Sequence, residues 1–182
     1  MVKKLIPELL KSSPKTFPQR ANPLKWVSLV KELFDNPWHR AMAKASMTGI
    51  LLADLLARTK HDDGFILFGH SLGARVIYYT LGALSTSPQN HVHKVCLLGG
   101  AIERRDKEGW KTAAASVRSE IHNYYSEKDS ILKYLYQGAN ALLSRPIGLG
   151  PITLDESKIV NHDVSETVNH HMDYKDAIRK FS

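Results

Sequence analysis

The sequence predicts an α/β fold: a parallel sheet with helices packed against it. Apolar runs of strand length alternate with longer segments whose apolar residues recur at helical spacing. Short polar links containing Gly, Pro, Asn or Asp separate these segments. Such alternation is typical of βα units, which build parallel sheets. The length of 182 residues and the hydrophobic fraction of 43% suit one domain with a sizeable core.

The first third of the chain predicts helical or extended structure and no strand. Residues 1–24 are interrupted by prolines, so we expect an extended lead-in with at most a short helix. Residues 24–34 carry apolar residues at helical spacing, and residues 38–59 predict a long helix with a wide apolar face. We therefore expect a single domain over residues 1–182, with a helical lead-in at 1–38 and a core at 39–182.

Strands and helices alternate in the rest of the chain. The first strand, Phe65 to Phe68, is apolar throughout, as expected of a parallel strand covered on both faces. The pair Gly99–Gly100 at the end of the second strand predicts a close approach of the backbone to a neighbouring element. Strands are expected over residues 65–68, 94–102, 117–125 and 157–164, and helices over 74–84, 103–115, 128–143 and 174–181.

One stretch, GFILFGHSLGAR at residues 64–75, combines a strand, a sharp turn and the start of a helix. Its Gly69, Ser71 and Gly73 form the G-x-S-x-G pattern of a nucleophile elbow, where a strained turn exposes the serine hydroxyl. The two glycines are expected to prevent collisions at the turn. The helix N-terminus would then point at the hydroxyl. The simpler alternative is a Gly-rich turn that carries a solvated serine.

A serine nucleophile needs a base to accept its proton and an acid to orient that base. In hydrolases with an elbow, the acid and then the histidine follow the serine along the chain. Asp129, just past the third strand, is the favoured acid, although its spacing from Ser126 also predicts a helix cap. Asp106, past the second strand, is the alternative acid.

Three histidines follow these acids. His171 is the favoured base, because the loop before the last helix would let its imidazole swing toward Ser71. His170 is the near alternative, and His162 is expected within the fourth strand. His70, beside the serine, is expected to point away from the base and to serve packing. The histidines lack a set of ligands at matched spacing, so no metal is expected.

The ordered blocks GHSLGARVIYYTL, VCLLGGAI, NYYSEKDSILKYLY and HHMDY resemble the α/β-hydrolase family that includes the transmembrane and coiled-coil domain-containing proteins. The segment NPWHRAMAKASMTGILLADLL is similar to the helix that precedes the elbow in that family. The resemblance spans residues 26–174. It implies a serine-hydrolase fold with the triad at Ser71, Asp129 and His171, and little about the substrate.

An α/β-hydrolase sheet normally has strands before the elbow strand, one of which supplies a second oxyanion donor. The first donor would be the backbone N–H of Leu72. Residues 1–64 contain no evident strand with a Gly-rich exit loop, so we expect a truncated sheet whose elbow strand lies at or near an edge. Residues 1–24, a second copy or a partner chain would complete this edge. Otherwise the chain is the C-terminal part of a larger hydrolase and is inactive alone.

Composition narrows the remaining possibilities. The formal charge is +7, but the basic residues are scattered and no nucleic-acid-reading motif is present, so nucleic acid is not an expected partner. No apolar stretch is long enough for a transmembrane span, and the first residues make a poor signal peptide. With Cys96 as a lone, buried cysteine, a cytoplasmic location is expected.

These features together predict a serine hydrolase of the esterase or lipase type that needs no cofactor and cleaves a small-molecule or lipid ester. The long loop at residues 144–156 would either line the acyl pocket or merely connect two elements. The alternative function is that of a non-catalytic, hydrolase-like interaction module that associates through its incomplete sheet.

Overall fold

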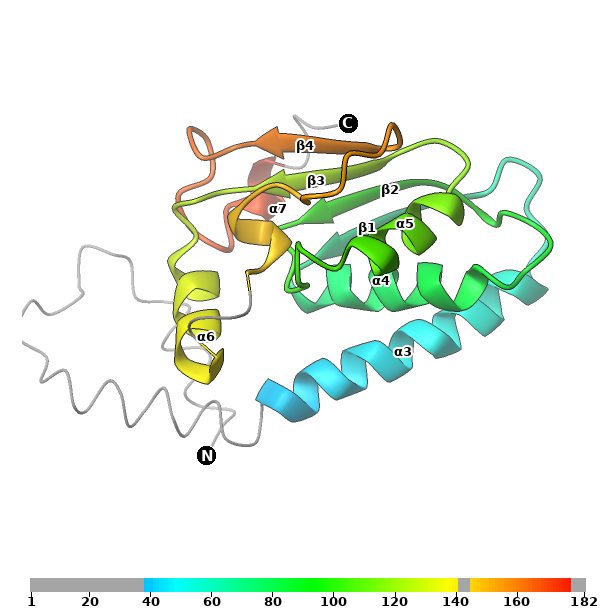
Figure 1. Cartoon of the computed structure of the whole chain (residues 1–182), viewed down its shortest axis with the longest axis horizontal. Coiled ribbons are helices and arrows are strands. Elements are labelled where there is room, and N and C mark those ends of the chain that lie inside the picture. The colour runs from blue at the N-terminus through cyan, green and yellow to red at the C-terminus, as the bar shows by residue number, and fades with distance from the viewer. Residues whose placement is uncertain (1–37, 141–144, 178–182) are drawn as a thin grey trace, which may run out of the picture.

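The computed structural model describes residues 38–140 and 145–177 (Figure 1). Nearly all of the predicted lead-in, including the proposed cover at residues 1–24, lies outside the described residues. So do the ends of two predicted helices, at residues 141–143 and 178–181. Within the described residues, a four-stranded parallel sheet is flanked by helices, which confirms the predicted α/β fold.

The strands follow one another across the sheet in the order of the sequence, and all neighbouring pairs are parallel. Their carboxyl ends therefore lie at one edge, where ligand sites of open α/β sheets are found. Gly69 and His70 at the end of the first strand pair with Leu97 and Leu98 of the second. The strands are β1 Phe65–His70, β2 Val92–Leu98, β3 Ile121–Tyr125 and β4 Ile159–Asp163.

Helices cover the sheet from both sides (Figure 1). Helices α4 and α5 lie on one face, α3 lies against the outer side of α4, and α7 lies on the opposite face. No helix within the described residues is long and apolar enough to cross a membrane. The helices are α3 His39–Arg58, α4 Leu72–Leu84, α5 Lys107–Ala115, α6 Ser130–Asn140 and α7 Tyr174–Ala177, with a 3-10 turn, η3 Ile147–Leu149, in the loop predicted at residues 144–156.

The third strand begins later than predicted. It was expected from residue 117 but starts at Ile121. Val117 forms only an isolated bridge with Val92. The N–H groups of Arg118 and Ser119 then donate to the carbonyls of Val92 and His93 near the start of β2. This segment is therefore anchored to β2 as a connection from α5, without the continuous pairing of a strand.

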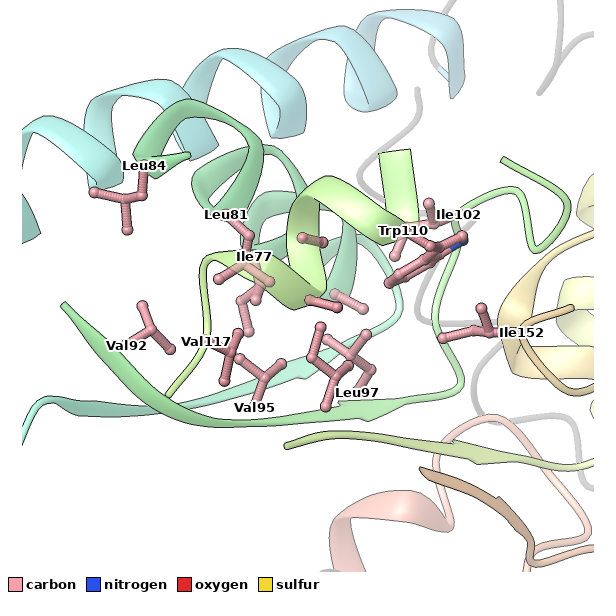
Figure 2. Packing of buried hydrophobic residues seen from close by; sticks show 14 of the residues in the cluster. Ile77, Leu81, Leu84, Val92, Val95, Leu97, Ile102, Trp110, Val117 and Ile152 are labelled. Carbon is pink, nitrogen blue, oxygen red and sulfur yellow. The ribbon is translucent and has the colours of Figure 1, made fainter. Parts of the chain in front are cut away.

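The main hydrophobic core fills the space between the sheet and helices α4 and α5 (Figure 2). Ile77 and Leu81 of α4 and Trp110 of α5 meet Val95 and Leu97 of β2 there, and all five are buried. Trp110 also donates its indole N–H to the carbonyl of Glu103 at 2.9 Å. A smaller core on the other face joins the sheet to the segment before α7 and to α7 itself.

The edge strand β1 differs from the prediction of a strand covered on both faces. Phe65 and Leu67 pack against the main core, whereas Ile66 and Phe68 on the opposite face are more than half exposed. Only the smaller core lies on that face, and it reaches β2, β3 and α7 but not these two side chains. Within the described residues β1 lies at the edge of the sheet, in line with the prediction of a strand at or near an edge, and its second face is uncovered.

Candidate active site

Ser71 occupies the turn between β1 and α4 in an unusual backbone conformation. Its φ of 57° and ψ of −117° make it the one non-glycine residue with positive φ among the described residues. Two backbone hydrogen bonds hold the turn. The N–H of Ser71 donates to the carbonyl of Leu98 at 3.0 Å, and the N–H of Ala101 donates to the carbonyl of Ser71 at 3.1 Å. Such a conformation costs on the order of 1–3 kcal/mol and persists only where surrounding structure enforces it.

The two glycines of the G-x-S-x-G pattern have different surroundings. A Cβ on Gly69 would lie 2.7 Å from the backbone nitrogen of Ala74 and 2.7 Å from Ile77, so a side chain is excluded at this position as predicted. A Cβ on Gly73 would meet no described atom within 4 Å. The collision predicted at Gly73 is therefore wrong, because the first turn of α4 leaves open space on that side.

The N-terminus of α4 begins directly after the serine. Leu72 is the first residue of this helix. The first N–H groups of an α-helix have no partner within the helix, so they can bind an external acceptor. Leu72 carries the first of these N–H groups beside Ser71, and its role as the first oxyanion donor stays a prediction.

Asp129 is fully buried and uses both carboxylate oxygens. Its Oδ1 accepts a hydrogen bond from the N–H of Leu132 at 3.0 Å, which caps helix α6. Its Oδ2 accepts from Nδ1 of His171 at 2.6 Å. The capping role and the contact with the favoured histidine were weighed as alternatives, but both occur.

His171 lies in the turn before α7, and only 6% of its surface is exposed. A carboxylate can only accept a hydrogen bond, so Nδ1 carries a proton and Nε2 keeps its lone pair when the ring is neutral. The loop that carries His171 is tied to the exit of β3, because Ser126 donates its hydroxyl to the carbonyl of Val168 at 2.6 Å. The acid and the base are thus held by two connected loops.

The hydroxyl of Ser71 makes no hydrogen bond with any described residue, and so none with His171. The carboxylate and the imidazole are therefore joined by a hydrogen bond, whereas the contact between Ser71 and His171 is not closed. Its neighbour His70 packs its ring against His171, with 4.5 Å between ring centroids. Catalytic hydrogen bonds are often long in unliganded enzymes and shorten when substrate binds.

His70 was expected to point away from the base, but it contacts His171 directly. Its Nε2 lies 2.8 Å from the carbonyl oxygen of His171, so Nε2 is the protonated nitrogen that donates. Burial and the nearby His171 lower the pKa of His70 below its ordinary value. A neutral His70 therefore holds His171 through two contacts: a hydrogen bond to its backbone carbonyl and packing against one face of its ring.

The alternative residues do not reach this cluster. Asp106 caps α5 by accepting from Gly109 N–H at 3.0 Å, and it accepts the Tyr78 hydroxyl at 2.7 Å, so it contacts no histidine. His170 donates its backbone N–H to Asp173 at 2.8 Å, and its ring makes no hydrogen bond within the described residues. Asp106 is therefore excluded as the acid that orients a histidine in this structure.

His162 lies within β4, as predicted, and away from Ser71. Its Nε2 is 2.9 Å from Nδ1 of His122 on β3, and Nε2 of His122 is 3.1 Å from Glu120. Burial lowers the pKa of both histidines, and for His122 the charge of Lys94 acts in the same direction. Within the described part of the chain, no group of three or more His, Cys, Asp or Glu side chains could hold a metal ion.

Sequence reasoning missed Tyr174, which is buried beneath the two histidines. Its ring lies 5.7 Å from His70 and 6.5 Å from His171 between centroids. A Cβ on Gly99 would lie 2.7 Å from this ring, so the predicted close approach at the glycine pair is explained in part by Tyr174. Burial raises the pKa of the phenol, and the phenol oxygen has no hydrogen-bond partner among residues 38–140 and 145–177. The one feature of the sequence that could have pointed to Tyr174 is its position three residues after the favoured base, His171.

Comparison with known proteins places the chain in a family. Residues 19–181 match the family described as "Protein of unknown function (DUF726)". The chain belongs to the DUF726 family. No solved structure matches it.

The chain spans about a quarter or less of the length of the curated relatives described next. It is 36% identical over 149 residues to "Uncharacterized membrane protein F35D11.3" of Caenorhabditis elegans, covering 80% of this chain and 24% of that protein. It is 31% identical over 161 residues to "Probable lipase MIL1" of Saccharomyces cerevisiae, covering 86% and 15%. It is 31% identical over 152 residues to "Transmembrane and coiled-coil domain-containing protein STS1" of Oryza sativa subsp. japonica, covering 82% and 22%.

Proposed function

We propose that this DUF726 chain is a serine hydrolase that cleaves a carboxylic ester. Ser71 is the nucleophile, His171 the general base and Asp129 the acid that orients it. The observation that carries the proposal is the buried hydrogen bond of 2.6 Å between Asp129 and His171, at the same end of the sheet as the strained turn of Ser71. A capping role alone would require only one carboxylate oxygen of Asp129.

The proposed reaction proceeds in two steps. Ser71 Oγ attacks the ester carbonyl carbon while His171 Nε2 takes the hydroxyl proton. The carbonyl oxygen becomes an oxyanion that accepts a hydrogen bond from Leu72 N–H. The intermediate expels the alkoxide, which receives the proton from His171 and leaves as an alcohol. Water then attacks the acyl-enzyme with His171 again as base, which releases the acid and restores Ser71.

His70 is a positioning residue in this mechanism. During both steps His171 carries a positive charge, which Asp129 stabilises through Nδ1. A second charged histidine packed against it would oppose that charge. The lowered pKa of His70 keeps its ring neutral at pH 7, so it can support His171 without this repulsion.

The substrate is proposed to be a lipid or another small-molecule ester. Support comes from the relative named "Probable lipase MIL1", although the chain spans only 15% of that protein. The N–H of Leu72, at the N-terminus of α4, is the one oxyanion donor that this proposal assigns. Loss of one such donor costs about 10²–10³ in kcat in a well-studied serine protease, so activity of this chain alone is expected to be low.

A fluorophosphonate probe and a short-chain nitrophenyl ester test the proposal. The wild-type chain should be labelled and should release nitrophenol, and Ser71→Ala should abolish both. Ser85→Ala, which removes an exposed hydroxyl at the end of α4, is the matched control and should behave as wild type. A folded wild-type protein that neither reacts with the probe nor turns over the ester contradicts the proposal.

A second candidate function rests on the open edge of β1. Ile66 and Phe68 are exposed on an edge strand, and such strands readily pair with another chain. The chain would then be a module that gains a strand from a second copy or a partner chain, and with it a complete sheet. Light scattering of Ile66→Lys/Phe68→Lys should then show a smaller molar mass than wild type, while Ser71→Ala should leave the mass unchanged. A monomeric wild-type chain argues against a homo-oligomer.

A further inference from the structure

Helix α3 presents large aliphatic side chains to solvent. Met47, Ile50, Leu51 and Leu55 are 65%, 57%, 72% and 61% exposed. Their spacing of three and four residues places them on one face of the helix, which we call the outer stripe. Single exposed aliphatic residues are ordinary on protein surfaces, but a continuous stripe of four marks an interaction site.

The opposite face of α3 is already used for packing. Ala45, Gly49, Ala53 and Leu56 are buried, and Thr80 of α4 donates its hydroxyl to the carbonyl of Gly49 at 3.0 Å. The middle of the helix therefore has apolar side chains on two opposite faces, and only one of these faces is packed against α4. Rotating α3 cannot hide the outer stripe without exposing the inner one, and none of the described elements covers the stripe.

A shallow groove extends the apolar surface beside the outer stripe. It has a volume of about 400 Å³, lies between α3 and the C-terminal half of α4, and borders the stripe at Ile50. Its other apolar lining residues are Ala53, Ala57, Ala83 and Leu84. The apolar surface is thus broader than one row of side chains.

Basic side chains stand at both ends of the outer stripe. Arg40 and Lys44 are exposed one to two turns before Met47, and Arg58 is exposed three residues after Leu55. The helix has one acidic residue, Asp54, which pairs with Arg58 at 2.8 Å. The charge of α3 is therefore positive, as is the formal charge of +7 of the whole chain.

We propose that the outer stripe of α3 docks onto the surface of an anionic lipid bilayer. An interfacial helix lies in the plane of the membrane with its apolar side chains at the boundary between headgroups and acyl chains. Lysine and arginine then contact anionic headgroups, each adding about 1 kcal/mol near the surface. The stripe and its terminal cations match this arrangement, whereas a second copy of the same positive helix would be repelled.

The docking does not depend on the proposed hydrolase activity. The outer stripe faces away from α4, which lies between α3 and the sheet (Figure 1).

Vesicle sedimentation with the full chain tests the proposal. The wild type should bind vesicles of phosphatidylcholine with phosphatidylserine, and bind pure phosphatidylcholine vesicles less. Leu51→Gln/Leu55→Gln keeps helix propensity and should weaken binding by roughly tenfold for each leucine that no longer inserts. Arg40→Gln/Lys44→Gln should weaken binding to anionic vesicles and reduce its dependence on salt.

Ile66→Gln/Phe68→Gln is the matched control, since it removes two other exposed apolar side chains and should leave vesicle binding unchanged. Two results would overturn the proposal: wild type that fails to bind anionic vesicles, or a leucine variant that binds as wild type does. A leucine variant with a clearly lower melting temperature would show that another part of the chain covers the stripe. A lower molar mass for that variant would show that a second copy covers it. The Ser71→Ala variant should bind vesicles normally, which separates docking from catalysis.

Discussion

The carboxylate of Asp129 holds the imidazole of His171 at 2.6 Å while its other oxygen caps helix α6 at 3.0 Å. Asp129→Asn should separate these two roles. Asparagine retains a cap oxygen, but its amide would favour the wrong histidine tautomer. We expect kcat for a nitrophenyl ester to fall by about 10⁴, with little change in thermal stability.

Asp129→Ala removes both the helix cap and the hydrogen bond that fixes the His171 tautomer. Its kcat should fall as far as that of Asp129→Asn, and its free energy of unfolding, measured with urea, should fall by about 1 kcal/mol. If Asp129→Asn keeps near-wild-type activity, Asp129 only caps the helix and the acid lies elsewhere.

Strain at Ser71 leads to a prediction about stability. Ser71→Gly should raise the free energy of unfolding by about 1 kcal/mol, because glycine adopts positive φ without a steric penalty. Ser71→Ala should leave stability nearly unchanged, since alanine has the same penalty as serine. Both variants lack the hydroxyl and should be inactive. Equal stabilities of the two variants would show that the turn is not strained.

The two glycines of the turn should respond differently to alanine. Gly69→Ala places a methyl group 2.7 Å from the backbone of Ala74 and should destabilise the protein by roughly 2–3 kcal/mol. Gly73→Ala fills open space in the first turn of α4 and should be neutral or stabilising by up to about 1 kcal/mol. Melting temperatures of the two variants and the wild type test this prediction. A Gly73→Ala variant as unstable as Gly69→Ala would contradict it.

Three partly buried histidines should make stability depend on pH. The pKa values of His70, His122 and His162 lie below the ordinary 6.5 in the folded protein, chiefly because of burial. Between the folded values and 6.5 the unfolded chain binds more protons, so stability is lost as pH falls below 6.5 and levels off beneath the folded values.

Urea unfolding from pH 8 to pH 5 should show this loss, and His70→Gln should reduce it. The Asp129–His171 pair would remain in that variant, which separates the effect of His70 from that of the pair. A free energy of unfolding that is flat across this range would show that the three histidines titrate normally.

Much of the fold followed from local patterns, and the errors have physical causes. The apolar run Phe65–Phe68 predicted a strand, but its length could not show how many of its faces are covered. That depends on which elements dock on each side, and Ile66 and Phe68 remain exposed. Val117 has strand propensity, yet the chain leaves α5 there and pairs only at a single bridge. Propensity is local, whereas pairing requires a neighbour.

The candidate site shows the same division. Chain order and loop position were enough to favour Asp129 and His171, because the carboxyl ends of parallel strands share one edge. They could not reveal that the ring of His70 donates to the carbonyl of His171, since these residues are 101 positions apart and meet only through folding. The packing of Tyr174 against both histidine rings could not be predicted either, because the contact with His70 forms only on folding.

By itself, the sequence determined the alternation of strands and helices, the sharp turn at Ser71 and the order of its candidate partners. These features depend on neighbouring residues, whose side-chain periodicity and backbone sterics act locally. Only the tertiary structure decided that Asp129 serves a helix and a histidine together and that Gly73 faces open space. It also decided that no described element covers the outer stripe of α3. Each of these depends on which distant surfaces meet, and that is set by packing of the whole domain.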